Sequence, residues 1–73
     1  MAARMSIILY TRPDCRYCDA ARRYLDERGD PYEERDITSD DQAEQEVIAI
    51  TGGALSVPIT VEDGDVRVGF PYQ

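Results

Sequence analysis

The chain has 73 residues, of which 42% are hydrophobic, and it carries a formal net charge of −7. This length predicts a single domain over residues 1–73, and the apolar fraction is typical of a folded domain rather than a disordered chain. The acidic balance argues against general nucleic-acid binding, which requires a basic surface. No apolar run approaches the roughly 20 residues of a membrane span, so we expect no membrane partner.

The first half of the chain predicts one strand and one helix. Residues 6–10 are apolar or β-branched between polar flanks, which is typical of a short buried strand. After a turn over residues 11–14, we expect a helix over residues 15–28, capped by Asp14 and ended by Gly29. The apolar residues of this helix recur at spacings of three and four: Tyr17, Ala20, Ala21, Tyr24 and Leu25.

The middle of the chain predicts a second strand and a second helix. Residues 31–37 favour a strand, although several charged residues there are poor strand formers. Ser39 and Gln42 fit a capping box, with Ser39 as the N-cap of the helix and Gln42 reaching back to it. The apolar stripe of that helix consists of Ala43, Val47 and Ile50, and Gly52-Gly53 ends it.

Two further strands close the predicted fold. Residues 59–61 and 66–68 favour strands, and Asp63-Gly64 between them is typical of a hairpin turn. The resulting order is β-α-β-α-β-β. Its first β-α-β unit requires a parallel pair with a right-handed crossover, and its last two strands are antiparallel.

Cys15 and Cys18 are the only cysteines, and two residues separate them at the junction of the first strand and helix. A Cys-x-x-Cys in this position is typical of a redox dithiol. If Cys15 opens the helix, the free backbone N–H groups and the helix dipole favour its thiolate. Cys18 then lies on the same face, within reach of a disulfide. We therefore predict that both residues are catalytic.

Two other roles for the cysteine pair are weaker. A structural disulfide is one alternative, but it would close so short a loop that it constrains the unfolded chain little. Zinc is the other, but a zinc site normally takes four ligands, and the chain has two cysteines and no histidine. We therefore expect no metal ligands and no bound cofactor.

Charge is distributed unevenly along the chain. Residues 1–28 carry six arginines against four acidic residues, a net charge of +2, whereas residues 29–73 have a net charge of −9. We interpret Arg22 and Arg23 as solvated surface. Arg16 lies beside Cys15 in the sequence, where a guanidinium would favour the thiolate and lower the pKa of Cys15.

Two motifs together resemble the glutaredoxin-type members of the thioredoxin-like superfamily. The family pattern Tyr-Thr/Ser-Lys-x-x-Cys-Pro-Tyr-Cys corresponds to residues 10–18, and its Thr-Val-Pro corresponds to Ser56-Val57-Pro58. The resemblance implies an α/β fold of thioredoxin type with a four-stranded mixed sheet. It also implies a cis peptide bond before Pro58, at a turn that offers the backbone of Val57 to a thiol substrate. The alternative is that Pro58 merely begins a strand.

The resemblance also implies further binding residues. Arg12 stands where the family has a lysine that helps to bind the glutathione carboxylate, and arginine can form such a contact through two hydrogen bonds. Tyr17 matches the family tyrosine that lines the sulfur site, although it could equally be an exposed helix residue. Arg16 replaces the usual proline of the family motif.

The end of the chain departs most from the family pattern. The family has Gly-Gly-x-Asp-Asp followed by a last helix, and the Gly-Gly backbone and an aspartate hold glutathione. Here only Gly69 matches, so we expect the last helix to be missing or truncated and glutathione to be an uncertain co-substrate. Apolar sheet surface would then be exposed unless residues 70–72 fold over it or a second copy covers it, which predicts a monomer or a weak dimer.

The implied function is thiol–disulfide exchange on protein disulfides or glutathione mixed disulfides. The reduced state would be restored by glutathione or by a thioredoxin reductase. Two alternatives stay open: a glutathione-bridged iron–sulfur cluster carrier, and a dedicated electron donor to a single partner such as ribonucleotide reductase. The first five residues are too short for a signal peptide, so we expect a cytoplasmic protein, with its thiols kept reduced.

Overall fold

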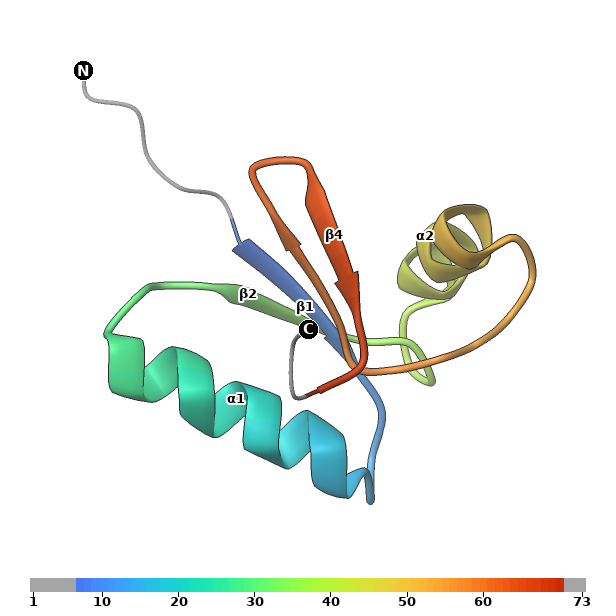
Figure 1. Cartoon of the computed structure of the whole chain (residues 1–73). Coiled ribbons are helices and arrows are strands. Elements are labelled where there is room, and N and C mark those ends of the chain that lie inside the picture. Colours follow the sequence, from blue (N-terminus) through green and yellow to red (C-terminus); the bar gives the residue numbers. More distant parts are fainter. Residues whose placement is uncertain (1–6, 71–73) are drawn as a thin grey trace.

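A four-stranded mixed sheet lies between two helices in the computed structural model, which describes residues 7–70 (Figure 1). Its strands are β1 (Ile7–Thr11), β2 (Glu33–Asp36), β3 (Ile59–Glu62) and β4 (Asp65–Val68), arranged in the order β2-β1-β3-β4. β1 runs parallel to β2 and antiparallel to β3, and β3 is antiparallel to β4. The predicted element order, the parallel pairing of the first two strands and the terminal hairpin are therefore confirmed.

Helix α1 (Arg16–Arg28) covers one face of the sheet. Ile7 and Leu9 of β1 point to this face and pack against Ala21 and Leu25 of the helix. Leu9 and Leu25 are fully buried. Gly29 ends the helix in a left-handed conformation, as its sequence position predicted, and its N–H donates to the carbonyl oxygen of Asp26.

The apolar stripe of α1 is narrower than the sequence spacing suggested. The fully buried positions are Cys18, Ala21 and Leu25, whereas the side chains of Tyr17 and Tyr24 are exposed. The two tyrosines lie at the exposed border of the stripe. Tyr24 contacts the ring of Phe70, with centroids 5.7 Å apart.

The second helix, α2 (Asp41–Thr51), covers the opposite face of the sheet (Figure 1). Ala43 and Val47 are buried there against Tyr10 and Ile59, and Ile50 packs at the edge of the same cluster. The two helices thus bury alternate residues of the central strand β1.

The N-cap of α2 differs from the prediction. Asp40, rather than Ser39, caps the helix, and its Oδ1 accepts hydrogen bonds from the backbone N–H groups of Gln42 and Ala43, at 3.0 and 3.2 Å. The backbone N–H of Ser39 instead donates to the carbonyl oxygen of Asp36 in the preceding turn. The capping box was therefore wrong by one residue, because that turn uses Ser39.

The residues of β2 are poor strand formers, but ion pairs of its charged side chains attach the strand to neighbouring elements. The parallel register pairs Glu34 with Leu9 and Arg35 with Tyr10, so Glu34 faces α1 and Arg35 faces α2. Arg35 pairs with Glu46 of α2 at 2.6 Å, and the Tyr10 hydroxyl donates to the same carboxylate. The strand is shorter than the predicted residues 31–37 because only its central four residues pair with β1.

The hairpin of β3 and β4 exposes apolar residues of β4 on the α2 side of the sheet. Beside α1 the strands present the polar pairs Thr60–Arg67 and Glu62–Asp65. The exposed apolar residues are Val66 and Val68, which alternate with the polar ones and lie on the α2 side.

The segment after β4 returns towards α1. Phe70 packs against the cluster of Leu9 and Leu25 and against the ring of Tyr24, which agrees with the expected cover by this residue. Pro71 and Tyr72 lie outside the described residues. Within residues 7–70 no helix follows β4, and self-association stays a prediction.

Candidate active site

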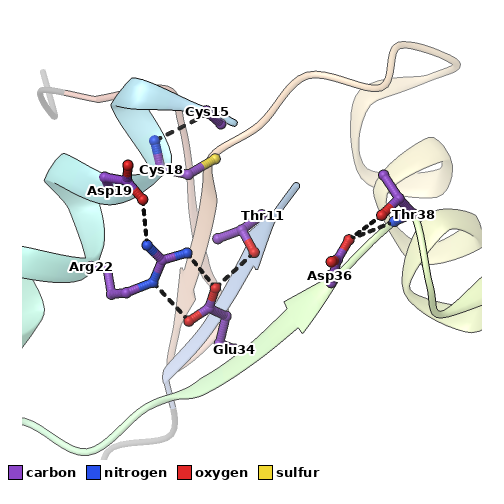
Figure 2. Close-up of polar contacts among 8 residues, drawn as sticks. All are labelled: Thr11, Cys15, Cys18, Asp19, Arg22, Glu34, Asp36 and Thr38. Atoms are coloured by element: carbon purple, nitrogen blue, oxygen red, sulfur yellow. Dashed lines mark hydrogen bonds and ion pairs between the residues drawn. The ribbon is translucent and has the colours of Figure 1, made fainter. Parts of the chain in front are cut away.

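The N-terminus of α1 places the two cysteines against each other. Cys15 is the N-cap residue, with an extended backbone, and its Sγ accepts a hydrogen bond of 3.1 Å from the backbone N–H of Cys18 (Figure 2). Asp14, the predicted cap, instead has a φ of 57°. A left-handed residue cannot adopt the extended conformation of an N-cap, so the cap falls one residue later, on the sulfur itself.

The two thiols have unequal exposure and unequal acidity. Both are free and buried, but Cys15 keeps 8% of its surface exposed, whereas Cys18 has none. Burial alone would raise the pKa of Cys15. Its interactions with Cys18, the Arg12 side chain and the Tyr17 backbone N–H outweigh burial and lower that pKa below the ordinary value. Burial raises the pKa of Cys18 to about 12, and Cys15 adds to the rise.

This difference assigns different chemistry to the two sulfurs. The thiolate is the reactive form of cysteine, so the more acidic and more accessible Cys15 is suited to a first attack on an external disulfide. Cys18 is protonated near neutral pH and out of reach of large substrates. This burial suits Cys18 to an attack on a sulfur already attached to Cys15.

The loop before β3 lies at the end of β1 that leads into the cysteine motif. The peptide bond between Val57 and Pro58 is cis, as the resemblance implied. Ile59 pairs with Tyr10, and continuing this register places Pro58 beside Thr11, at the end of β1 that leads into the cysteine motif. Pro58 is fully buried and Val57 partly so.

Gly69 lies in the same region through its backbone. Its N–H donates a hydrogen bond of 2.7 Å to the carbonyl oxygen of Pro58. The structure therefore brings this predicted binding residue next to the cis-proline turn, but its amide already has a partner there.

The predicted arginines differ in their relation to Cys15. Both Arg12 and Arg16 are exposed, but only Arg12 is among the leading influences on the pKa of Cys15. The tuning role of Arg16 stays a prediction. Tyr17 is 55% exposed, and its contribution to Cys15 comes from its backbone N–H rather than its ring.

A charged cluster beside Cys18 was missed in the sequence. Arg22 of α1 forms ion pairs of 2.5 Å with both Asp19 and Glu34, and the Thr11 hydroxyl donates to Glu34 at 2.9 Å (Figure 2). The sequence interpretation treated Arg22 as solvated surface. The spacing of four residues from Cys18 was the available sign that it shares the dithiol's face of the helix.

The glutaredoxin family profile matches residues 7–67. The chain belongs to the glutaredoxin family. Members of this family are thiol–disulfide oxidoreductases. Glutaredoxin 1 of Rickettsia felis is 41% identical over 65 residues, which are 88% of this chain and 63% of that protein. The chain therefore spans less than two thirds of the length of that glutaredoxin.

Solved structures place the chain among small thioredoxin-like proteins. The thioredoxin-like protein BC3987 is 34% identical, with a TM-score of 0.81 over 88% of this chain and 86% of that one. The glutaredoxin-like NrdH-redoxin from Escherichia coli is 28% identical, with a TM-score of 0.78 over 89% of this chain and 83% of that one. The fold is therefore of the glutaredoxin type within the thioredoxin-like group.

Two further findings concern metal and membrane. Among residues 7–70, no group of three or more histidine, cysteine or acidic side chains is arranged to hold a metal ion. No helix in the same part of this glutaredoxin is long and apolar enough to cross a membrane.

We expect Arg12→Gln to make Cys15 less acidic. The Arg12 guanidinium helps to lower the pKa of Cys15, so its removal raises that pKa and leaves less thiolate at a given pH. The rate of alkylation by iodoacetamide, measured against pH in the Cys18→Ser background, should have its midpoint at higher pH. The two proteins should converge at high pH, where both are fully ionised.

Arg16→Gln is the matched control for this measurement. It removes the same charge at the residue that follows Cys15, and we expect a smaller shift in the pH midpoint of alkylation. A larger shift with Arg16→Gln than with Arg12→Gln would contradict the assignment to Arg12 and support the sequence-based role of Arg16.

Proposed function

We propose that this glutaredoxin reduces disulfides by dithiol exchange, with Cys15 as the nucleophile and Cys18 as the resolving cysteine. The observation that carries the proposal is the unequal pair of thiols at the start of α1. Cys15 has a lowered pKa and an N-cap position, while Cys18 is fully buried with a pKa of about 12.

The reaction proceeds in two exchange steps. The Cys15 thiolate attacks one sulfur of the substrate disulfide, forms a mixed disulfide and releases the other sulfur as a thiolate. Cys18 loses its proton and attacks the sulfur of Cys15. The Cys15–Cys18 bond forms, the bond to the substrate breaks, and the reduced substrate leaves. Two electrons thus pass from the dithiol to the substrate.

We propose protein disulfides and glutathione mixed disulfides as the substrate classes. Arg12 at the exposed side of Cys15 is suited to a substrate carboxylate, and the turn at Val57 and Pro58 lies beside the end of the strand that leads to the dithiol. The reduced cytoplasm is the compartment in which such a dithiol would be recycled.

The donor that restores the dithiol is either glutathione or a thioredoxin reductase, and one observation favours the reductase. In the family pattern a Gly-Gly backbone helps to hold glutathione, but here the amide of Gly69 donates to Pro58. The similar NrdH-redoxin from E. coli is described as having a thioredoxin-like activity profile. A dedicated electron donor to one enzyme, such as ribonucleotide reductase, is the second candidate function.

The recharging assay tests these proposals directly. Consumption of NADPH is followed with glutathione plus glutathione reductase, and separately with thioredoxin reductase, using a protein disulfide as the final acceptor. We expect turnover with thioredoxin reductase and little with glutathione. Turnover only with glutathione would show that the chain binds it without the free Gly69 amide and would reject the reductase assignment.

Failure with both donors would count against a general oxidoreductase. A brown product after anaerobic reconstitution with iron, sulfide and glutathione would then support the iron–sulfur cluster carrier. Rapid oxidation by a single enzyme, with no activity on a generic protein disulfide, would support the dedicated donor.

A further inference from the structure

We propose that Arg22, fixed in place by Asp19 and Glu34, promotes the resolving attack by Cys18. This inference rests on the proposed dithiol exchange and concerns its second step alone. Asp19 and Glu34 are positioning residues in this scheme, and Arg22 supplies the charge.

The geometry of the cluster gives the Arg22 guanidinium a fixed orientation. Its Nε donates to Oε1 of Glu34 at 2.9 Å and its Nη2 to Oε2 at 2.5 Å, which is a two-point pairing. Its Nη1 donates to Oδ1 of Asp19 at 2.5 Å. A planar guanidinium held through three of its nitrogens has little freedom to turn towards solvent.

The cluster lies on the side of α1 that carries Cys18. Arg22 follows Cys18 by four residues, so the two side chains occupy the same face of the helix, one turn apart. Figure 2 shows the guanidinium between the helix turn of Cys18 and the carboxylate of Glu34 on β2. The Arg22 side chain, of which 33% is exposed, thus lies one helical turn from Cys18 on the same face of α1.

Few charged groups face Cys18 from the elements packed around it. Helix α1 contributes Arg22 and Asp19, and β2 contributes Glu34. Strand β1 contributes the uncharged hydroxyl of Thr11, which donates to Glu34. The loop before β3 adds the fully buried, apolar Pro58 at this end of the sheet.

The charge of Arg22 matters most in the resolving step. In the reduced protein, burial raises the pKa of Cys18 and Cys15 raises it further, whereas a hydrogen bond to the backbone of Arg12 and the charge of Arg22 lower it. Once Cys15 is in a mixed disulfide, its own negative charge is gone. Burial is then the main obstacle to the Cys18 thiolate, and Arg22 is the side chain that opposes it.

A purely structural role is the alternative explanation. The carboxylates of Asp19 and Glu34 balance the guanidinium, and the cluster ties α1 to β2 whatever happens at Cys18. The experiment must therefore separate the charge of Arg22 from its hydrogen-bonding shape.

One equivalent of 5,5′-dithiobis(2-nitrobenzoate) provides that experiment, because each exchange step releases one thionitrobenzoate. In the first phase Cys15 attacks the reagent and keeps half of it as a mixed disulfide. In the second phase Cys18 attacks the sulfur of Cys15, its proton goes to solvent, and the remaining thionitrobenzoate leaves. Stopped-flow absorbance follows both phases in the full chain.

We expect Arg22→Gln to slow the second phase and leave the first unchanged. Each unit by which the pKa of Cys18 rises reduces its thiolate fraction tenfold, while the remaining thiolate becomes more nucleophilic, so the net rate falls about threefold per unit. Arg22→Lys keeps the charge but loses the planar fork, and it should restore most of the native rate. Arg23→Gln, next along the exposed side of α1, is the matched control and should change neither phase.

Three results would overturn the inference or its basis. An unchanged second phase in Arg22→Gln would remove any role for the charge. A lysine variant as slow as the glutamine variant would assign the effect to the hydrogen-bonded shape and hence to structure. A native protein with no fast first phase would instead refute the proposed function, so the two failures are distinguishable. Circular dichroism of each variant confirms that it is folded.

Discussion

Cys15→Ser should abolish disulfide reduction in every assay. Serine has no thiolate at neutral pH, and no other residue can make the first attack because Cys18 is fully buried. We expect the rate with a protein disulfide to fall by more than roughly a thousandfold, to the uncatalysed background. The measurement is NADPH-coupled turnover with the donor that supports the native protein.

Cys18→Ser should affect the turnover of the two proposed substrate classes differently. Glutathione mixed disulfides need only Cys15, because a second glutathione can complete the exchange, so their turnover should be largely retained. Protein disulfides need Cys18 to release the substrate, so target proteins should accumulate as mixed disulfides on Cys15, visible as adducts on a non-reducing gel. Equal losses of activity in both variants and with both substrates would contradict the assignment of separate roles.

The separate roles of Cys15 and Cys18 both follow from their positions at the N-terminus of α1. The residue that begins α1 is itself a cysteine, so its sulfur takes the hydrogen bond that a capping oxygen would otherwise accept. Cys18, three residues later, lies on the buried face of α1 together with Ala21 and Leu25. A single local structure thereby makes one thiol acidic and accessible and the other buried and resistant to ionisation.

The local features of the fold could be predicted from the sequence. The hairpin at Asp63-Gly64 and the helix stop at Gly29 were correct, because positive φ values are confined to few residue types. The two N-caps were each wrong by one residue. Asp14 and Ser39 are good capping residues by type, but the preceding turns use them, so the cap shifts to Cys15 and Asp40. A capping preference alone does not contain that information.

The candidate site also contains some features that the sequence predicts and others that it does not. The cysteine pair and the cis bond before Pro58 followed from contiguous motifs and a family resemblance. The pairing of Arg22 with Glu34 did not, because it depends on the parallel register of β1 and β2, which places Glu34 beside Leu9 under α1. Contacts between residues on three different elements require the tertiary structure.

Leu25→Ala should greatly reduce the stability of the fold at a position distant from the dithiol. Leu25 is fully buried among Leu9, Ala21 and Phe70, and its loss leaves a cavity under α1. Alanine is a good helix former, so the cost comes from packing alone. We expect the free energy of unfolding to fall by about 2–5 kcal/mol. Urea unfolding, followed by circular dichroism, measures this change.

That loss is large for so short a chain. A domain of this length has a total stability on the order of 4–11 kcal/mol, so the substitution would remove a substantial share of it. Glu27→Ala, on the exposed side of the same helix, is the matched control and should change stability by less than about 0.5 kcal/mol. Equal unfolding midpoints for the two variants would show that α1 does not depend on this packing. The orientation of Cys18 would then have to be fixed by the ion pairs of Arg22 rather than by the core.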